Sequence, residues 1–247
     1  PTIYPELCNA AQFVELTDED LVNRGKQPTY GRENLEKWRA GGEGYESTDW
    51  YDEVVRPWAP QQQYNLNVRG GTEKASYFAS LGYLNEGGMW RTNSSNFQRF
   101  NFRSNMDVKI TDALSASLSL SGQKEQRHSS PWNPFYIMAS IQQTFPTSHP
   151  YANNNPDYYA VTNISARNVK AVTDPSVMGF DKVQNKRFEG TASLNYAFQN
   201  IKGLSMKGLF YYRNEDNFRD LFQKKYHYYA YDKAADQYNV VYTGFNP

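Results

Sequence analysis

Apolar and polar side chains alternate along the stretch from Gln98 to Gly122. From position 100 to position 110, the even positions other than Ser104 are apolar: Phe100, Phe102, Met106, Val108 and Ile110. The odd positions are polar or charged: Arg99, Asn101, Arg103, Asn105, Asp107 and Lys109. A repeat of two residues is typical of a β-strand with one apolar and one polar face. After Thr111, Asp112 and Ala113 the alternation resumes, which predicts a long antiparallel hairpin.

The length of this hairpin favours a membrane barrel. Each arm alternates for about ten residues, whereas strands of globular proteins usually run about 5–6 residues and about 9–11 tilted residues cross a bilayer. Further alternating runs occur at 64–69, 77–83, 187–198 and 204–212. We therefore expect about six strands in all.

The predicted connections between these strands fall into two classes. The short ones follow Gly70, Ile110 and Gln199, and the long ones follow Leu84, Gly122 and Arg213. Short turns at one end and long loops at the other are typical of outer-membrane barrels. The predicted fold class is all-β: an antiparallel segment of about six strands from a large transmembrane up-and-down β-barrel, with short helices in long extracellular loops.

Residues 1–60 differ from the rest and predict a loop region with short helices that leads into the barrel. Asn9 can cap a first helix and Gly25 can end it. A second helix is predicted over 32–39, and a third short turn can be capped by Ser47 or Thr48.

Residues 61–247 are predicted to form the barrel hairpins, as part of one larger barrel domain. The longest loop is expected at 122–186, with a helix over 134–143. Loops of this length are uncommon inside compact domains and are usually functional. The tyrosine-rich stretch 226–242 is interpreted as a further loop with one more hairpin arm.

Composition excludes several classes of protein. Basic and acidic residues balance at 26 each, which argues against a nucleic-acid surface carried by net charge. The longest apolar run covers only 135–139, far short of the roughly 20 residues of a membrane-spanning helix. Aromatic residues make up 16% of the chain, led by 20 tyrosines, which fits either the interfacial girdles of a barrel or stacking surfaces for sugars.

The sequence offers no catalytic or metal site. His128, His149 and His227 lie far apart without metal-ligand spacing, and no Gly-x-Ser-x-Gly motif occurs. We therefore expect no enzyme activity and no cofactor. What remains is recognition of a polar ligand.

Six aromatic residues on two long loops are the candidate ligand contacts: Trp90, Trp132, Tyr136, Tyr151, Tyr158 and Tyr159. The alternative is that they only pack the loops. Five charged residues on the polar faces of predicted strands are placed to touch a substrate, to hydrate the lumen or to anchor a plug: Arg99, Arg103, Lys109, Arg187 and Glu189.

Several motifs resemble the TonB-dependent transporters of the SusC/RagA type. They are the stretches 47–54, 59–71, 77–88 and 99–107. The first reads Ser-Thr-Asp-Trp-Tyr-Asp-Glu-Val, the second Ala-Pro-Gln-Gln-Gln-Tyr-Asn-Leu-Asn-Val-Arg-Gly-Gly and the fourth Arg-Phe-Asn-Phe-Arg-Ser-Asn-Met-Asp. The resemblance implies an outer-membrane barrel of about 22 strands from Bacteroidota-like bacteria. Such a protein imports glycans, oligosaccharides or peptides as nutrients.

The resemblance also implies partners. These are a SusD-like surface lipoprotein, the TonB-ExbB-ExbD complex of the inner membrane as the source of energy, and the outer-membrane lipid, with no nucleic acid. The chain shows no plug or TonB box that matches the family, so we expect it to be a piece of a longer polypeptide.

The alternative is a soluble, secreted carbohydrate-binding β-sandwich, which would also alternate and be rich in tyrosine. The two readings differ in what covers the apolar faces. A sandwich would seal them against a second sheet, whereas a barrel segment would leave all of them pointing outward.

Overall fold

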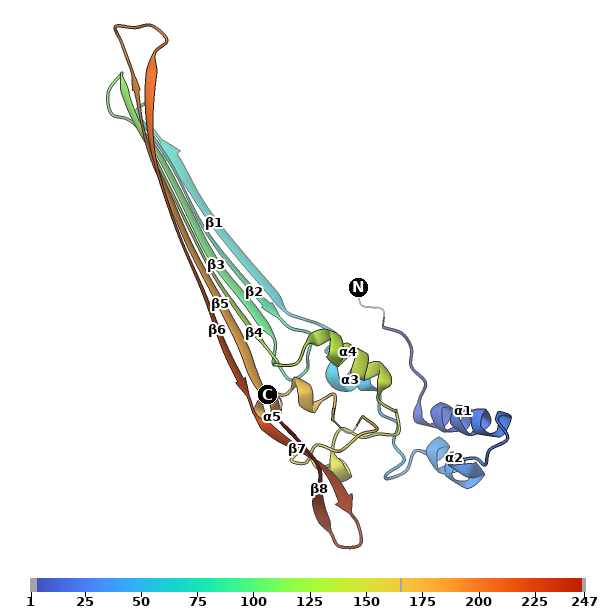
Figure 1. Cartoon of the computed structure of the whole chain (residues 1–247). Coiled ribbons are helices and arrows are strands. Elements are labelled where there is room, and N and C mark those ends of the chain that lie inside the picture. The colour runs from blue at the N-terminus through green and yellow to red at the C-terminus, as the bar shows by residue number, and fades with distance from the viewer. Residues whose placement is uncertain (1–3, 165, 246–247) are drawn as a thin grey trace.

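The computed structural model describes residues 4–164 and 166–245, and its main feature is a long six-stranded antiparallel sheet (Figure 1). The strands are β1 (Gln61–Gly71), β2 (Ala75–Gly87), β3 (Asn96–Lys109), β4 (Leu114–Ser129), β5 (Gly179–Ala197) and β6 (Ser205–Gln223). Each strand pairs with its neighbours in sequence. The result is an open up-and-down sheet with β1 and β6 at its edges, which confirms the predicted fold class.

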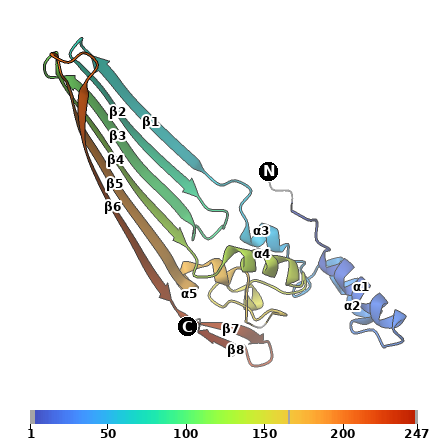
Figure 2. The same cartoon turned by 45° about the horizontal axis from the view of Figure 1, so that its top comes forward.

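The helices and a second hairpin gather beyond one end of the sheet (Figures 1 and 2). They are α1 (Ala10–Asn23), α2 (Gly31–Ala40), α3 (Trp50–Val54), α4 (Pro134–Gln143), η1 (Ala152–Asn154), η2 (Ala171–Thr173), α5 (Pro175–Met178), β7 (Lys225–Asp232) and β8 (Gln237–Phe245). None of the helices in the described part of the chain has the length and apolar character needed to cross a membrane.

The connections divide between the two ends of the sheet as predicted. Residues 72–74, 110–113 and 198–204 form the short turns at one end. Residues 88–95 and 130–178 form the long connections at the other end, together with the hairpin β7–β8 (Figure 1). This separation is the arrangement of an outer-membrane barrel, with its longer loops on one side of the membrane.

The strands on both sides of the longest loop extend further than the alternation indicated. β4 continues to Ser129 and β5 begins at Gly179, so the loop covers 130–178 instead of 122–186. β6 likewise continues to Gln223. In these extensions most side chains on both faces are polar, for example Lys124 and Gln126 on the face that is apolar elsewhere. The period of two residues therefore disappears although the strand continues.

The strand register places most of the apolar side chains of the six strands on one side, here called the apolar face. One cross-strand row consists of Tyr77, Met106, Leu118, Ala192 and Phe210. These side chains face outward, and Phe210 is 66% exposed. No second sheet covers this face within the described residues, so the β-sandwich alternative is not favoured.

The height of the apolar face matches a bilayer. On β3 it extends from Phe100 to Val108, and Ile110 continues it into the following turn. Ten steps of about 3.3 Å along a strand tilted by about 45° give a band about 23 Å tall, close to the roughly 25 Å apolar band of membrane barrels. Lys124 and Lys186 lie opposite each other on this face and mark the limit of the apolar band on the side of the long connections.

The buried residues of the chain gather beyond the end of the sheet. This loop core contains Trp50, Tyr51, Val54, Val55, Trp90, Ile137, Ile141, Val169, Ala171, Val172, Met178, Tyr226 and Tyr228. Trp50 of α3 packs with α4, and its indole N–H donates to the carbonyl of Phe145 at 3.0 Å. The loops thus have a hydrophobic core of their own, which gives them a fixed shape.

Local capping explains where the N-terminal helices begin. Asn9 and Gln12 form a reciprocal capping box at the start of α1, as the sequence predicted for Asn9. α3 is capped by Asp49, whose carboxylate accepts from the N–H groups of Tyr51 and Asp52, so the expected cap at Ser47 or Thr48 is wrong. The Ser47 hydroxyl instead accepts from the N–H of Ala10, which joins α1 to this segment.

Asp18 holds the connection between α1 and α2. Its carboxylate accepts from the N–H groups of Thr29, Tyr30 and Gly31 at 2.8, 3.0 and 2.8 Å. Partial burial acts to raise the pKa of Asp18, but these three donors outweigh it and hold the pKa below its usual value. The stability that the ionised Asp18 carboxylate adds to the folded state is therefore fully present above the unfolded-state pKa of about 3.9. It is lost as the pH falls through the lower pKa of Asp18 in the folded state.

We expect Asp18→Asn to accelerate amide exchange at residues 29–31 by about tenfold, because the amide side chain offers one acceptor atom where the carboxylate uses two charged ones. Hydrogen exchange of the whole protein at neutral pH measures this. Asp20→Asn is the control, since Asp20 only forms an exposed ion pair with Arg24. Equal exchange in both variants would contradict the prediction.

Candidate ligand-contacting surfaces

The second side of the sheet, here called the polar face, carries the predicted charged residues. The register aligns Asn101, Gln123, Arg187 and Glu215 in one row and Arg103, Ser121, Glu189 and Arg213 in the next. Arg99 and Lys109 also lie on this face of β3. All five charged residues singled out in the sequence therefore share the polar face.

An ion-pair network crosses β5 and β6 on the polar face. Arg187 lies 3.2 Å from Glu215, and Arg213 lies 2.5 Å from Glu215 and 3.6 Å from Glu189. Closer to the loops, Arg219 forms two 2.9 Å hydrogen bonds with Asp181. These ion pairs fix the positions of the charged side chains on β5 and β6. Most of the charge of the three arginines is compensated by the carboxylates beside them.

Trp132 and Tyr136 form the first group of predicted aromatic contacts, around Arg167. The Arg167 guanidinium carbon lies 5.6 Å from the Trp132 ring and 5.9 Å from the Tyr136 ring, within the range of cation–π attraction. Tyr136 on α4 is 52% exposed, whereas Trp132 packs partly against the loop core. This group presents an aromatic and a cationic surface to solvent.

Tyr151, Tyr158 and Tyr159 form the second group. The Tyr151 and Tyr159 rings lie 5.1 Å apart, and their backbones form an antiparallel bridge. Tyr158 stacks on Tyr238 of β8 with 3.9 Å between ring centroids and 6° between planes. The hairpin β7–β8 therefore shares an aromatic surface with the longest loop.

Trp90 lies apart from both groups. It is 2% exposed and belongs to the loop core. Its carbonyl accepts from the Arg56 guanidinium, and its backbone bridges to Val55. In this position Trp90 supports the loops, and a ligand would reach it only if they moved.

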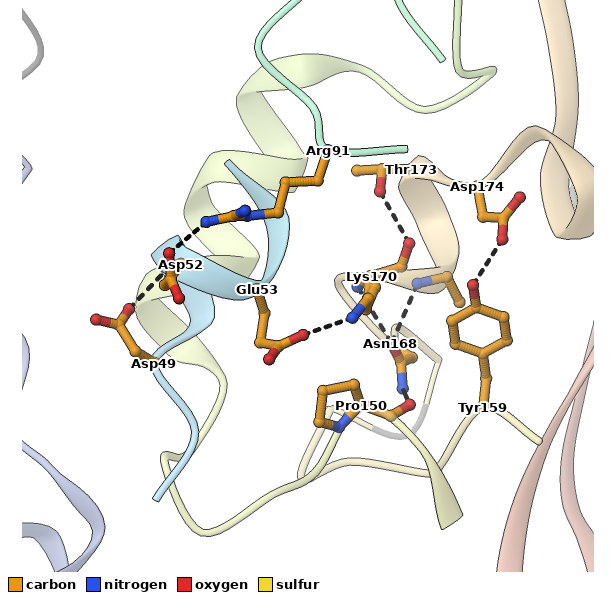
Figure 3. A network of polar contacts seen from close by, with 11 residues as sticks. Asp49, Asp52, Glu53, Arg91, Pro150, Tyr159, Asn168, Lys170, Thr173 and Asp174 are labelled. Atoms are coloured by element: carbon orange, nitrogen blue, oxygen red, sulfur yellow. Dashed lines mark hydrogen bonds and ion pairs between the residues drawn. The ribbon is translucent and has the colours of Figure 1, made fainter. Parts of the chain in front are cut away.

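A polar network links the loops beneath the tyrosine group (Figure 3). Asn168 is fully buried and uses its whole amide: it donates to the carbonyls of Pro150 and Ala160 and accepts from the N–H groups of Lys170 and Ala171. The two donated bonds tie Asn168 to the segments around Pro150 and Ala160, and the two accepted bonds fix the turn that follows it, so this part of the 130–178 loop has one defined path.

Two ionisable groups in this network have shifted pKa values. Burial alone would lower the pKa of Lys170, but its 2.5 Å contact with Glu53 raises it. Burial and the hydrogen bond to Asp174, at 2.6 Å, raise the pKa of Tyr159 above its usual range. Lys170 therefore stays charged and Tyr159 neutral at physiological pH, and the Lys170 ammonium lies 4.8 Å from the Tyr151 ring.

Sequence reasoning missed three residues of these surfaces: Arg167, Lys170 and Tyr238. Each meets its aromatic partner only because the loops fold back on each other. The sequence contained no periodic signal for these contacts, since they join segments without regular secondary structure or segments far apart in the chain.

The comparison with known sequences gives one clear relative. The chain is 28% identical over 110 residues to the TonB-dependent receptor P26 of Formosa agariphila, which covers 44% of this chain and 10% of that protein. No protein-family model matches the chain. This chain therefore spans about a tenth of the length of the curated relative that it matches.

Solved structures give the same result for the fold. The chain superposes on the RagAB peptide importer in its "closed-closed" state with a TM-score of 0.51 and 23% identity, over 66% of this chain and 18% of that one. The "open-open" state of the same importer gives a TM-score of 0.51 and 22% identity over the same shares. These comparisons confirm the resemblance that the motifs indicated, to a barrel segment of the TonB-dependent transporters of the SusC/RagA type.

Proposed function

We propose that the chain forms part of the barrel wall and extracellular loops of an outer-membrane importer for nutrient oligosaccharides or peptides. The observation that carries this proposal is the combination of a bilayer-high apolar face with a polar face that bears ion pairs. A membrane barrel with a water-filled interior needs both faces. The separation of short turns from long connections supports an orientation in which the loop core lies outside the cell.

The proposed importer takes its energy from the TonB-ExbB-ExbD complex and works with a SusD-like surface lipoprotein. The loop core supports this arrangement, because it gives the long loops a packed and ordered surface on which a lid protein can rest. In this proposal the importer moves its substrate chemically unchanged.

Within this function, we propose that the exposed members of the two aromatic groups contact the substrate as it enters. Tyr136 is the exposed one, and Tyr151 and Tyr158 are half-buried with part of each side chain open to solvent. Aromatic rings provide an apolar surface with a polar edge, which suits both sugar rings and peptide side chains. Trp90 and Tyr159 support this surface from below through the loop core and Asp174.

Deleting the gene for the full-length protein is the test of import. We expect the mutant bacterium to lose growth on the imported oligosaccharide or peptide as sole nutrient, and a copy lacking the TonB-interacting segment to fail to restore it. Normal growth of the deletion mutant on every such nutrient would refute the proposal.

Tyr136→Ala combined with Tyr158→Ala is expected to weaken substrate binding by about tenfold or more, since loss of an aromatic contact commonly costs about 1 kcal/mol each. Binding to the purified full-length protein measures this. Tyr64→Ala is the control, because Tyr64 is about as exposed as Tyr136 but lies on the apolar face. Equal affinity of all variants would show that the aromatic residues only pack the loops.

A further inference from the structure

Basic residues are distributed unequally between the two faces of the six-stranded sheet. The polar face carries seven arginines and two lysines: Arg69, Arg99, Arg103, Arg127, Arg187, Arg213, Arg219, Lys109 and Lys207. Its acidic residues are six: Glu86, Asp107, Glu125, Asp181, Glu189 and Glu215. The polar face therefore has an excess of positive charge although the whole chain is neutral.

The charge on β3 is less compensated than the charge on β5 and β6. Arg187, Arg213 and Arg219 have carboxylate partners within 4 Å. In the part of the chain that the structure describes, Arg99 and Arg103 form no ion pair. The carboxylate that lies opposite Arg99, Glu125, accepts a 2.6 Å hydrogen bond from Gln123 instead. Arg99 and Arg103 are thus two adjacent carriers of the uncompensated positive charge, to which Arg69, Arg127, Lys109 and Lys207 also contribute within the described residues.

These two arginines line a hollow of about 520 Å³ on the polar face. The lining also includes Phe78, Ser80, Asn101 and Gln123, with Arg187 and Glu189 on the β5 side. Guanidinium groups bind carboxylates through two parallel hydrogen bonds. Amide and hydroxyl side chains can both donate to and accept from sugar hydroxyls, and the half-buried Phe78 offers a ring for stacking.

We propose that this hollow binds the carboxylate groups of an acidic oligosaccharide, one built from uronic acids. The inference rests on the proposed import function and names the class of substrate for it. The polar lining favours a hydroxyl-rich ligand, since apart from phenylalanine rings the hollow offers no apolar side chain to a peptide. A lining with excess positive charge also concentrates anions from solution and speeds their association.

The test measures binding to the purified full-length protein. The probes are short oligomers of polygalacturonate and of alginate, each beside its carboxyl-reduced neutral form, with an acidic peptide as a further probe. We expect the acidic oligomers to bind at least about tenfold more tightly than their neutral forms. In Arg99→Gln/Arg103→Gln this preference should fall to about twofold or less, and Arg99→Lys/Arg103→Lys should lie between the two because lysine retains charge without the planar fork.

Lys124→Gln/Lys186→Gln is the matched control, since it removes the same charge from the apolar side of the sheet and should leave the preference unchanged. Thermal unfolding of every variant checks that the barrel remains folded. An unchanged preference for acidic oligomers in Arg99→Gln/Arg103→Gln overturns the inference. If the unfolding midpoint of that variant is also lowered, the two arginines instead hold another part of the barrel in place.

The outcomes separate the inference from the function on which it rests. If neutral oligosaccharides or the peptide bind as well as the acidic sugars, the importer stands and the proposed substrate class falls. If neither sugars nor peptide bind and the gene deletion leaves growth unchanged, both fall.

Discussion

Leu118→Arg is expected to destabilise the full-length protein in lipid by about 2–4 kcal/mol, the cost of an arginine on the lipid side near the bilayer midplane. Leu118 lies on β4 in the middle of the apolar face, in the row that contains Met106 and Ala192. If lipid surrounds this face, the guanidinium has no carboxylate beside it, since its cross-strand neighbours are Met106 and Ala192. Denaturant unfolding and refolding in phospholipid vesicles measures the change.

Ser117→Arg is the control, one residue away on the opposite face. The Ser117 hydroxyl donates to Asp107 at 2.6 Å, so an arginine there gains a carboxylate neighbour and water. We expect a change within about 1 kcal/mol. Similar losses in the two variants would mean that both faces meet the same solvent, and the membrane assignment would then be wrong.

Trp50→Ala is expected to weaken the loop core by about 3–5 kcal/mol, as is typical when a large aromatic side chain is removed from a packed site. Trp50 is 1% exposed and also donates the indole hydrogen bond to Phe145. The truncation leaves a cavity between α3 and α4 and an unpaired carbonyl. Native-state hydrogen exchange at 50–55 and 137–141 measures the local free energy of opening.

Trp58→Ala provides the comparison for this effect. Trp58 is 84% exposed and lies outside the loop core, so its loss should change exchange at the same amides by less than about 0.5 kcal/mol. The sheet should remain intact in both variants. Uniform acceleration across β3 and β4 in Trp50→Ala would show that the loop core and the sheet unfold together.

The fold was predictable where one physical signal dominates the local sequence. From Phe100 to Ile110, lipid on one side and water on the other impose strict alternation, and the strand followed from it. The helix predicted over 134–143 is also present, with the proline at its first position and Asn133 as its cap. In the second half of β4, beyond the apolar face, both sides of the strand meet polar surroundings. The alternation therefore ends there, and the sequence did not predict that the strand continues.

The candidate site was less predictable, because its contacts join distant segments. Glu53 and Lys170 are 117 residues apart in sequence and meet only in the folded loops. Composition identified aromatic residues on the two long loops but did not separate a buried Trp90 from an exposed Tyr136. That distinction depends on the loop core, which forms from segments as far apart as α3 and β7.

The two outermost strands, β1 and β6, each pair on one side only within this sheet. In hydrocarbon, the N–H and C=O groups along their other sides have no water to bind, and each group left alone costs several kcal/mol. These strands therefore require further strands beside them before the sheet can enter a bilayer. Insertion and ring closure should then occur as one cooperative event, with no stable half-inserted sheet along the way.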